Sequence, residues 1–157
     1  SISLLPKKLT RRVNIIHQVK ENQIEQVKKL YKSNNIKADV KTFIKNMDRV
    51  HKIANLIICR AGASTIAENL ISGVPAIYIP LNHSSNDHQY LNALKVVKNK
   101  SGWLVREKTI ETKYFVKFIK EILTSEEILK NYSDNSKKIA MPAASKKLLK
   151  LIGALND

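Results

Sequence analysis

Cysteine, glycine, proline and aromatic residues are all scarce in this sequence. Cys59 is the only cysteine among 157 residues, which excludes an internal disulfide framework or a cysteine-rich metal site and is typical of a reducing compartment. With four glycines, four prolines and 43% hydrophobic residues, the composition is that of a globular protein and not of a disordered or collagen-like chain. A chain of this length can bury a core without disulfides. We therefore predict a single domain spanning residues 1–157.

Long hydrophobic runs are also lacking. The longest apolar stretches, such as the eight residues Val74–Leu81, are much shorter than the roughly 20 residues that span a bilayer. The N-terminus shows no signal-peptide pattern. The sequence therefore predicts a soluble, cytoplasmic domain.

Acidic residues are few. The 13 Asp and Glu residues are outnumbered by 28 Lys and Arg residues, which gives a net charge of +15. Such a charge attracts nucleic acid, an anionic membrane or a phosphate-bearing ligand. An AT-rich coding bias is a second explanation, because the chain is also rich in Ile and Asn. Aromatic residues do not interleave with the lysines as single-stranded nucleic acid requires, so we predict no nucleic-acid partner and keep the membrane surface as an alternative.

Short apolar runs alternate with stretches of helical periodicity along the chain. The predicted strands are Val13–His17, Asp39–Ile44, Asn55–Cys59, Val74–Pro80 and Gly102–Val105. The predicted helices cover residues 24–31, Met47–Ala54, Ser64–Ile71 with Gly73 as its cap, Asp87–Lys98 and 115–122, and two Lys-rich helices follow, the last from near Pro142. This alternation predicts an α/β fold, a Rossmann-like parallel sheet flanked by helices. In such sheets ligands bind beyond the carboxyl ends of the strands. The candidate segments follow His17, Ile44, Cys59 and Pro80.

The beginning of the chain does not fit the start of such a fold. The segment Ser1–Arg12 has the sequence pattern of the end of a helix, whereas a doubly wound domain begins with a strand and a phosphate-binding turn. We therefore predict that the first strand is missing and that the chain is truncated.

The segment Cys59–Glu68 (CRAGASTIAE) joins a buried strand to a helix through small residues. Gly62 permits a close backbone approach and a positive φ, and Ser64 or Thr65 can cap the helix. Free N–H groups in the first helical turn attract phosphate, and the Glu68 carboxylate can accept two ribose hydroxyl protons. An ordinary strand-to-helix turn with a capping box is the alternative. The segment lacks the Gly-x-Gly-x-x-Gly fingerprint and the Walker lysine, which disfavours a dehydrogenase or a P-loop enzyme.

Polar side chains crowd the segment Pro80–Ala93, which follows the next predicted strand. Its Asn, Gln, His and Asp residues supply the paired donors and acceptors that sugar hydroxyls need. His83 and His88 are five residues apart, and no cysteine or second carboxylate completes a ligand set, so we predict no metal site.

The other histidines and the cysteine have simpler interpretations. His17 ends a strand and, with Gln18, is a further candidate for the site. His51 is predicted to be a surface or packing residue. Cys59, at the end of an apolar strand, is predicted to be an inert core residue.

Residues 55–93 (NLIICRAGASTIAENLISGVPAIYIPLNHSSNDHQYLNA) resemble the donor-domain signature of the MurG family, the bacterial peptidoglycan N-acetylglucosaminyltransferases that convert lipid I to lipid II. Weaker similarity extends across the rest of the chain. The resemblance implies the C-terminal, Rossmann-like domain of a GT-B glycosyltransferase, which binds UDP-N-acetylglucosamine between two domains. It also implies a peripheral enzyme on the inner face of the bacterial membrane that serves cell-wall synthesis, cell shape and cell division.

The resemblance further implies a role for each residue of the signature. The backbone of Ile44, after Phe43, would recognise uracil, and Glu68 would bind the ribose hydroxyls. His88 and Gln89 would contact the hydroxyls of N-acetylglucosamine. The diphosphate would lie at the helix start formed by Gly62, Ala63, Ser64 and Thr65.

Members of this family act without a metal or other cofactor. The helix dipole and backbone amides stabilise the departing UDP while the 4-hydroxyl of the acceptor attacks the anomeric carbon with inversion. The Gly-rich turn, the catalytic base and the acceptor site belong to preceding sequence and to an N-terminal domain, so we predict no catalytic residue in this chain and no activity of the chain alone. Two alternatives stay open: another GT-B UDP-sugar enzyme, such as an epimerase or a glycolipid glycosyltransferase, and a non-catalytic basic module that binds membrane or nucleic acid.

Overall fold

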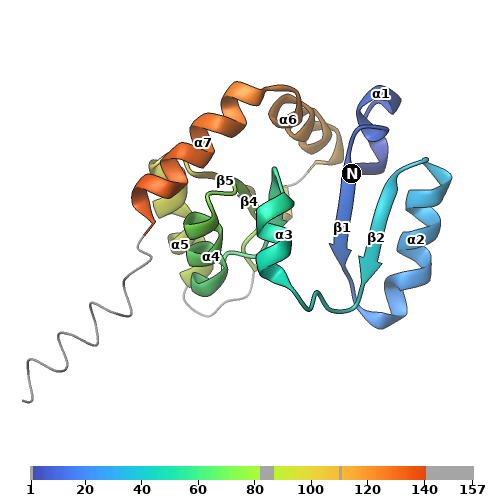
Figure 1. Ribbon diagram of the computed structural model, residues 1–157, viewed down its shortest axis with the longest axis horizontal. Coiled ribbons are helices and arrows are strands. Elements are labelled where there is room, and N and C mark those ends of the chain that lie inside the picture. Colours follow the sequence, from blue (N-terminus) through green and yellow to red (C-terminus); the bar gives the residue numbers. More distant parts are fainter. Residues whose placement is uncertain (1, 82–86, 110, 141–157) are drawn as a thin grey trace, which may run out of the picture. The chain divides into compact units, whose positions relative to one another are not determined.

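The computed structural model describes residues 2–81, 87–109 and 111–140 (Figure 1). The strands are β1 (Asn14–Gln18), β2 (Lys37–Lys41), β3 (Ile57–Cys59), β4 (Ala76–Tyr78) and β5 (Gly102–Leu104). The α-helices are α1 (Lys7–Thr10), α2 (Ile24–Ser33), α3 (Met47–Ile53), α4 (Ala63–Ser72), α5 (His88–Lys98), α6 (Thr112–Thr124) and α7 (Glu126–Ile139). Short 3-10 helices are η1 (Ile2–Leu4), η2 (Glu21–Gln23) and η3 (Glu107–Thr109). Within these ranges, no helix is long and apolar enough to cross a membrane.

The described strands all pair in parallel, and they form two separate ladders. β1 pairs with β2 in a register that places Asn14 beside Lys37 and Gln18 beside Lys41. In the second ladder, β4 lies between β3 and β5. The sequence pattern predicts one continuous sheet, whereas the described strands form a pair and a triple.

The predicted parallel α/β fold is confirmed, including a helical beginning and each predicted element up to residue 139. The bounds predicted for the second strand, Asp39–Ile44, are wrong. β2 begins at Lys37 and ends at Lys41 because it pairs residue for residue with β1. The alternating pattern of the sequence continues beyond the end of the partner strand, so Ile44 lies in a loop. The helix predicted near Pro142 lies outside the described residues.

The first of two compact units comprises residues 1–50 and 110–125. In this unit α2 packs on the β1–β2 ladder through a core of Tyr31, Ile36 and Val40, with Ile15 and Val27 against them. Val27 and Tyr31 are four residues apart and therefore share the helix face that covers the strands. The assignment of residues 1–157 to one donor-binding domain stays a prediction.

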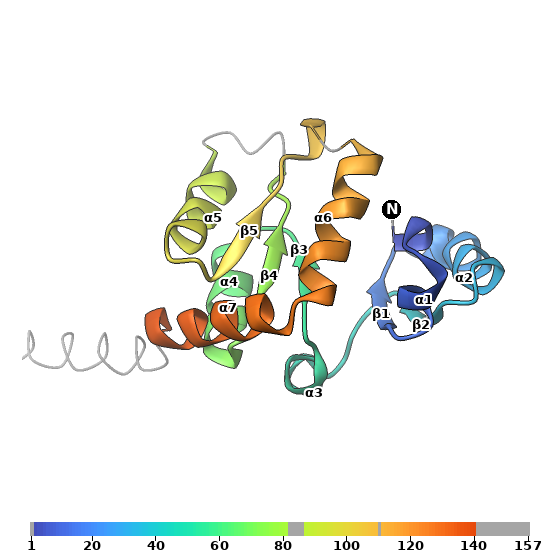
Figure 2. The same ribbon diagram turned by 90° about the horizontal axis from the view of Figure 1, so that it is seen from above.

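The second unit comprises residues 51–109 and 126–157. Its core joins Ile66 of α4 and Val96 of α5 to the β3–β4–β5 ladder, and Figure 2 shows both helices beside these strands. The first residue of β5 has to be a glycine, because a Cβ at position 102 would lie 2.7 Å from the carbonyl oxygen of Ala76. Gly73, with a φ of 71°, ends α4 and confirms the predicted C-terminal cap. The C-terminal end of α4 is thus fixed, and β4, in the middle of the ladder, is fully buried.

Candidate functional site

The three-stranded ladder brings several segments to one edge. Because β3, β4 and β5 are parallel, the chain leaves this edge after Cys59, Tyr78 and Leu104. Two backbone bonds extend the ladder there, from Ile79 N to Cys59 O at 2.8 Å and from Val105 N to Tyr78 O at 2.9 Å. Helices α4 and α5 follow β3 and β4, so both begin at this edge, where open α/β sheets bind their ligands.

The start of α4 has free backbone donors. Its N-cap is Gly62, which has no side chain, and the first bond of the helix runs from Ile66 N to Gly62 O at 2.9 Å. The N–H groups of Ala63, Ser64 and Thr65 therefore have no acceptor within the helix. No acidic residue lies in the first turn. The prediction that Ser64 or Thr65 caps the helix is wrong, because both residues lie inside the first turn and not before it.

Gly62 is not required by the backbone. Its φ is −64°, so the positive φ expected from the sequence is wrong. A Cβ built there would meet only Thr65 Oγ1, at an ordinary 3.6 Å. An alanine would therefore fit the fold. What the glycine adds is an open approach to the N–H groups of α4.

The other predicted site residues of this unit lie on the two helices. Glu68 on α4 is exposed and forms no hydrogen bond or ion pair with another described residue. His88, the first residue of α5, is exposed as well. Gln89 is half-buried, and its Oε1 accepts a bond from Leu81 N at 3.1 Å. The N-cap of α5, Asp87, has a φ of 49° and makes no side-chain cap bond, so the start of this helix is open too.

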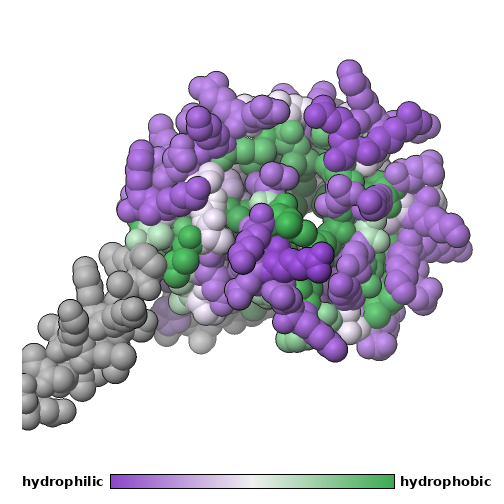
Figure 3. Space-filling model, viewed as in Figure 1, coloured by the Kyte–Doolittle hydropathy of each residue, from purple (hydrophilic) through white to green (hydrophobic). Residues whose placement is uncertain are grey.

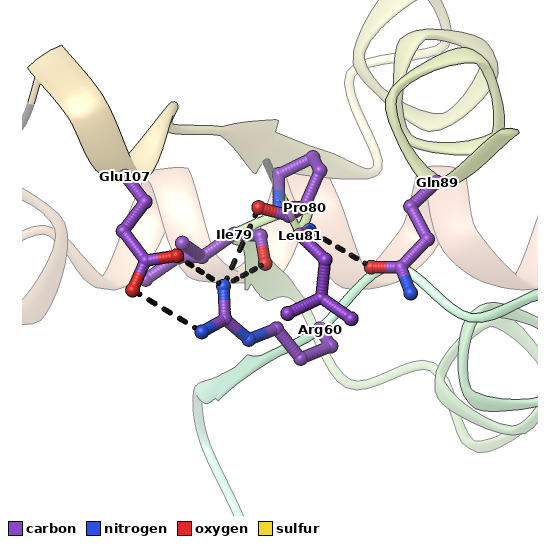
Figure 4. A network of polar contacts seen from close by, with 6 residues as sticks. All are labelled: Arg60, Ile79, Pro80, Leu81, Gln89 and Glu107. Carbon is purple, nitrogen blue, oxygen red and sulfur yellow. Dashed lines mark hydrogen bonds and ion pairs between the residues drawn. The ribbon is translucent and has the colours of Figure 1, made fainter. Parts of the chain in front are cut away.

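Arg60 is a residue of this edge that the sequence reasoning missed. Figure 4 shows its guanidinium group between Glu107 and the backbone of Ile79 and Pro80. Hydrogen bonds from Arg60, and its positive charge, hold the pKa of the Glu107 carboxyl below its ordinary value. A local signal exists, since a charged residue directly follows an apolar strand, but its partner is 47 residues away.

The carboxyl edge of the β1–β2 ladder, in the first unit, carries a separate pocket. Its volume is about 540 Å³, and His17, Gln18 and Thr42 are among its lining residues. His17 Nδ1 lies 2.9 Å from Tyr31 Oη, and burial lowers the pKa of His17. Both candidates from the end of the first predicted strand thus line a cavity. Phe43 and Ile44 follow Thr42, and Phe43 is 67% exposed.

A buried polar network joins α4 to the ends of β3 and β4. Asn69 Nδ2 donates to Tyr78 Oη at 3.2 Å and to Cys59 Sγ at 3.6 Å, and Asn69 Oδ1 lies 3.1 Å from His51 Nε2. Burial raises the pKa of Cys59 to about 11 and that of Tyr78 to about 12. The thiol is therefore protonated at neutral pH, as an inert core residue should be. His51 is a packing residue, as predicted.

Metal ligands do not gather in the described part of the chain: no group of three or more His, Cys, Asp or Glu residues there could hold an ion. His83, one of the two histidines weighed as ligands, lies outside the described residues. The chemistry that this edge does offer is backbone N–H groups for an anion, and a carboxylate and an amide for hydroxyl groups.

Comparison with known proteins identifies the family. The sequence profile of the glycosyltransferase family 28 C-terminal domain matches residues 2–148. The chain belongs to this family. A crystal structure of Acinetobacter baumannii MurG matches with a TM-score of 0.85 and 26% identity, over 98% of this chain and 48% of that one. The glycotransferase of kitacinnamycin, with a TM-score of 0.59 and 15% identity, shares the fold alone.

Curated relatives confirm the resemblance to the MurG family. The UDP-N-acetylglucosamine--N-acetylmuramyl-(pentapeptide) pyrophosphoryl-undecaprenol N-acetylglucosamine transferase of Psychromonas ingrahamii is 34% identical over 142 residues, which cover 90% of this chain and 40% of that protein. The protein of the same name from Rickettsia prowazekii is 36% identical over 86% of this chain and 35% of its own length. The chain thus spans about 40% of the length of the relatives that it matches.

Proposed function

We propose that this chain is the donor-binding part of an inverting glycosyltransferase that moves N-acetylglucosamine from UDP-N-acetylglucosamine to lipid I, forming lipid II of peptidoglycan. The observation that carries this proposal is the start of α4, where Gly62 leaves three backbone N–H groups free and no carboxylate competes for them. A helix start of this kind binds a diphosphate. Family membership and the names of the relatives support the same donor.

Each ligand group has a proposed partner. The backbone N–H groups of Ala63, Ser64 and Thr65 bind the diphosphate. The Glu68 carboxylate accepts hydrogen bonds from the ribose hydroxyl groups. For the backbone of Ile44, in the loop after β2, recognition of uracil is proposed from the family resemblance alone. Of the remaining predicted residues, His88 and Gln89 bind the sugar, and Phe43, His17 and Gln18 are secondary candidates.

The proposed chemistry needs no metal from this chain. Charge develops on the diphosphate as the glycosidic bond breaks, and fixed N–H donors at a helix start stabilise that charge without reorganising. The catalytic base and the acceptor site are proposed to lie in the part of the relatives that this chain does not cover. The chain alone is therefore expected to bind donor weakly at best and not to catalyse transfer.

Titration of the chain with UDP tests the proposal. We expect UDP to bind to the unaltered chain. In Glu68→Ala the affinity for UDP should fall about tenfold, because a charged hydrogen bond to the ribose is lost. Glu127→Ala on α7 removes another exposed carboxylate and serves as the matched control. If UDP fails to bind at millimolar concentration, the donor-site proposal is wrong.

A different UDP-sugar enzyme of the same GT-B class, such as an epimerase or a glycolipid glycosyltransferase, is the second candidate. It would share the diphosphate and ribose contacts and differ at His88 and Gln89. Titration with UDP-glucose beside UDP-N-acetylglucosamine separates the two, because the proposed function requires that the second ligand bind more tightly.

Attraction to an anionic membrane is proposed as a property of the whole enzyme, at the inner face of the bacterial membrane. Its support is the net charge of +15 and the hydrophilic side chains that cover much of the face drawn in Figure 3. Such a location suits a lipid-linked acceptor, and through it cell shape and division. Binding to vesicles of anionic lipid should weaken steeply with salt. Equal binding to neutral vesicles would contradict this attraction, and salt-dependent binding to oligonucleotides would favour a nucleic-acid module instead.

A further inference from the structure

Arg60 directly follows β3, and its guanidinium group is bonded to two other segments (Figure 4). Nη1 donates to the carbonyl oxygens of Ile79 at 3.1 Å and Pro80 at 3.3 Å. Glu107 accepts two further bonds, from Nη1 at 2.9 Å and from Nη2 at 3.2 Å. Ile79 and Pro80 follow β4, and Glu107 lies in η3 after β5. One side chain therefore joins the segments that follow all three strands of the ladder.

The ladder does not depend on this contact. Backbone bonds at Ile79 and Val105 already continue the pairing beyond the ends of the strands. The side chains of Arg60 and Glu107 are 45% and 47% exposed, and an ion pair at such exposure adds little to stability. It does fix geometry, because the planar guanidinium fork meets both carboxylate oxygens in one orientation. The effect of the pair is therefore local, on the backbone that Arg60 holds.

The peptide group between Pro80 and Leu81 is held at both ends. Its carbonyl oxygen accepts a bond from Arg60, and its N–H, which belongs to Leu81, donates to Gln89 Oε1 at 3.1 Å. A peptide group is planar, so its two ends cannot move independently. Hydrogen bonds in such a chain also strengthen one another. Arg60 thus acts on Gln89 through a single rigid peptide.

The bond from Leu81 orients the amide of Gln89. A primary amide carries an acceptor oxygen at one end and two N–H donors at the other. Because the oxygen meets Leu81 N, the Nε2 end is turned away from that backbone, as Figure 4 shows. Among the described residues, none accepts a hydrogen bond from Nε2 of Gln89. The donor end of the amide is therefore available to a ligand.

We infer that the Arg60–Glu107 pair is a positioning device, which holds the Pro80–Leu81 peptide so that Gln89 directs its N–H donors at a hydroxyl oxygen of the sugar. This inference rests on the proposed function, and it concerns the sugar part of the nucleotide donor and not the UDP part. Arg60 and Glu107 touch no ligand in this scheme. They set the direction of a residue that does.

The test separates sugar recognition from nucleotide recognition. UDP and UDP-N-acetylglucosamine are titrated into the ¹⁵N-labelled chain. We call the affinity for UDP-N-acetylglucosamine divided by the affinity for UDP the sugar gain. We expect Arg60→Lys, which keeps the charge and loses the fork, to reduce the sugar gain about threefold to tenfold with UDP affinity unchanged. Gln89→Ala should reduce it similarly. The double variant should lose no more than either single variant, because both changes disable one device.

Two further variants keep the test sharp. Glu107→Gln retains the shape of the side chain and should reduce the sugar gain, whereas Lys108→Gln, beside it on η3, should not. The Leu81 amide proton resonance reports the bond to Gln89 directly, and we expect it to shift in Arg60→Lys and not in Lys108→Gln.

The outcomes that overturn the inference differ from those that overturn the proposed function. Failure of UDP to bind the unaltered chain contradicts both. Binding of UDP with a sugar gain that falls in Gln89→Ala but not in Arg60→Lys or Glu107→Gln overturns the inference alone. A double variant in which the two losses of sugar gain add also overturns the inference. So does an Arg60→Lys variant in which the affinity for UDP falls as much as the affinity for UDP-N-acetylglucosamine, because Arg60 would then merely support the fold.

Discussion

The two parallel ladders end in carboxyl edges of different chemistry. At the edge of β1–β2, the helix that follows has an acidic first turn containing Glu25, and the adjoining pocket is lined by His17 and several amide side chains. At the edge of β3–β4–β5, α4 and α5 have no acidic residue in the first turn and no side-chain cap. The same strand-to-helix topology therefore yields one helix start with an acidic residue, at α2, and one whose free N–H groups suit an anion, at α4.

The two units also differ in what lies beneath these edges. The first unit has an apolar core around Tyr31, whose hydroxyl is hydrogen-bonded with His17. The second unit buries Asn69 at 1% exposure, with partners on β3, β4 and α3. A buried polar network fixes one arrangement of its neighbours, because any other arrangement leaves donors or acceptors unpaired. The ends of β3 and β4 are thus tied to α3 and α4 through the side chain of Asn69.

The largest effect should come from Asn69→Ala. This change leaves Tyr78 Oη without its donor and creates a cavity, so we expect a loss of about 3 kcal/mol in the free energy of unfolding. Asn34→Ala removes a half-buried amide that donates to Leu30 O at the end of α2, and it should cost about 0.5 kcal/mol. Urea unfolding of both variants measures the difference, and equal losses would contradict the contrast between the units.

An acidic residue at the start of α4 should affect binding and stability in opposite directions. In Ser64→Asp the new carboxylate repels the diphosphate and competes for the N–H groups, so UDP affinity should fall about tenfold, while the helix dipole adds about 0.5 kcal/mol to stability. Thr112→Asp adds a carboxylate at the start of α6, whose first turn also has no acidic residue, and should leave UDP affinity unchanged. Titration and thermal unfolding give the two readouts. A loss of UDP affinity in Thr112→Asp would show that the effect is not specific to the start of α4.

Removal of one hydroxyl tests the core of the first unit. Tyr31→Phe deletes the partner of His17 Nδ1 and should reduce the free energy of unfolding by about 1 kcal/mol. Tyr114→Phe changes a side chain that is 66% exposed and should have no measurable effect. Chemical denaturation distinguishes them; a larger loss in Tyr114→Phe would show that this hydrogen bond does not stabilise the unit.

The smallest effect concerns pH and is confined to the first unit. Burial lowers the pKa of His17 below its ordinary 6.5, so the folded chain prefers the neutral ring. Below pH 6.5 the unfolded chain then binds more protons than the folded chain, and stability falls as pH drops from 6.5 toward the lowered pKa. His17→Gln should remove this slope. NMR titration of the ring protons reads the pKa directly, and a value above 6.5 would reverse the predicted sign.

Local pattern was sufficient for most of the fold. Helical spacing of apolar residues located α2, α5 and α6, and Gly73 was identified as the cap of α4 because few other residues accept a positive φ at the end of a helix. The bounds of β2 were missed, because they are set by its pairing with β1 and not by its own alternation. The division into two ladders was missed for the same reason: pairing depends on which strands are neighbours, and no strand carries that information alone.

In the candidate site, residue types were easier to predict than partners. The small residues before α4 and the polar residues at the start of α5 are visible in the sequence, and the MurG family resemblance follows from them. The roles of Gly62 and Ser64 were misjudged, since a shift of one or two residues in the helix start changes which residue is the cap. Arg60 was missed because its carboxylate partner lies 47 residues away.

The sequence by itself determined the family, the parallel α/β order and the chemical character of the segments at the strand ends. Only the tertiary structure decided which of those groups are already engaged. It pairs Arg60 with Glu107, turns the Gln89 oxygen toward Leu81 N, and leaves the N–H groups at the start of α4 open. The physical reason is range: periodicity and capping act over a few residues, whereas a hydrogen bond between loops depends on how the strands beneath them are paired.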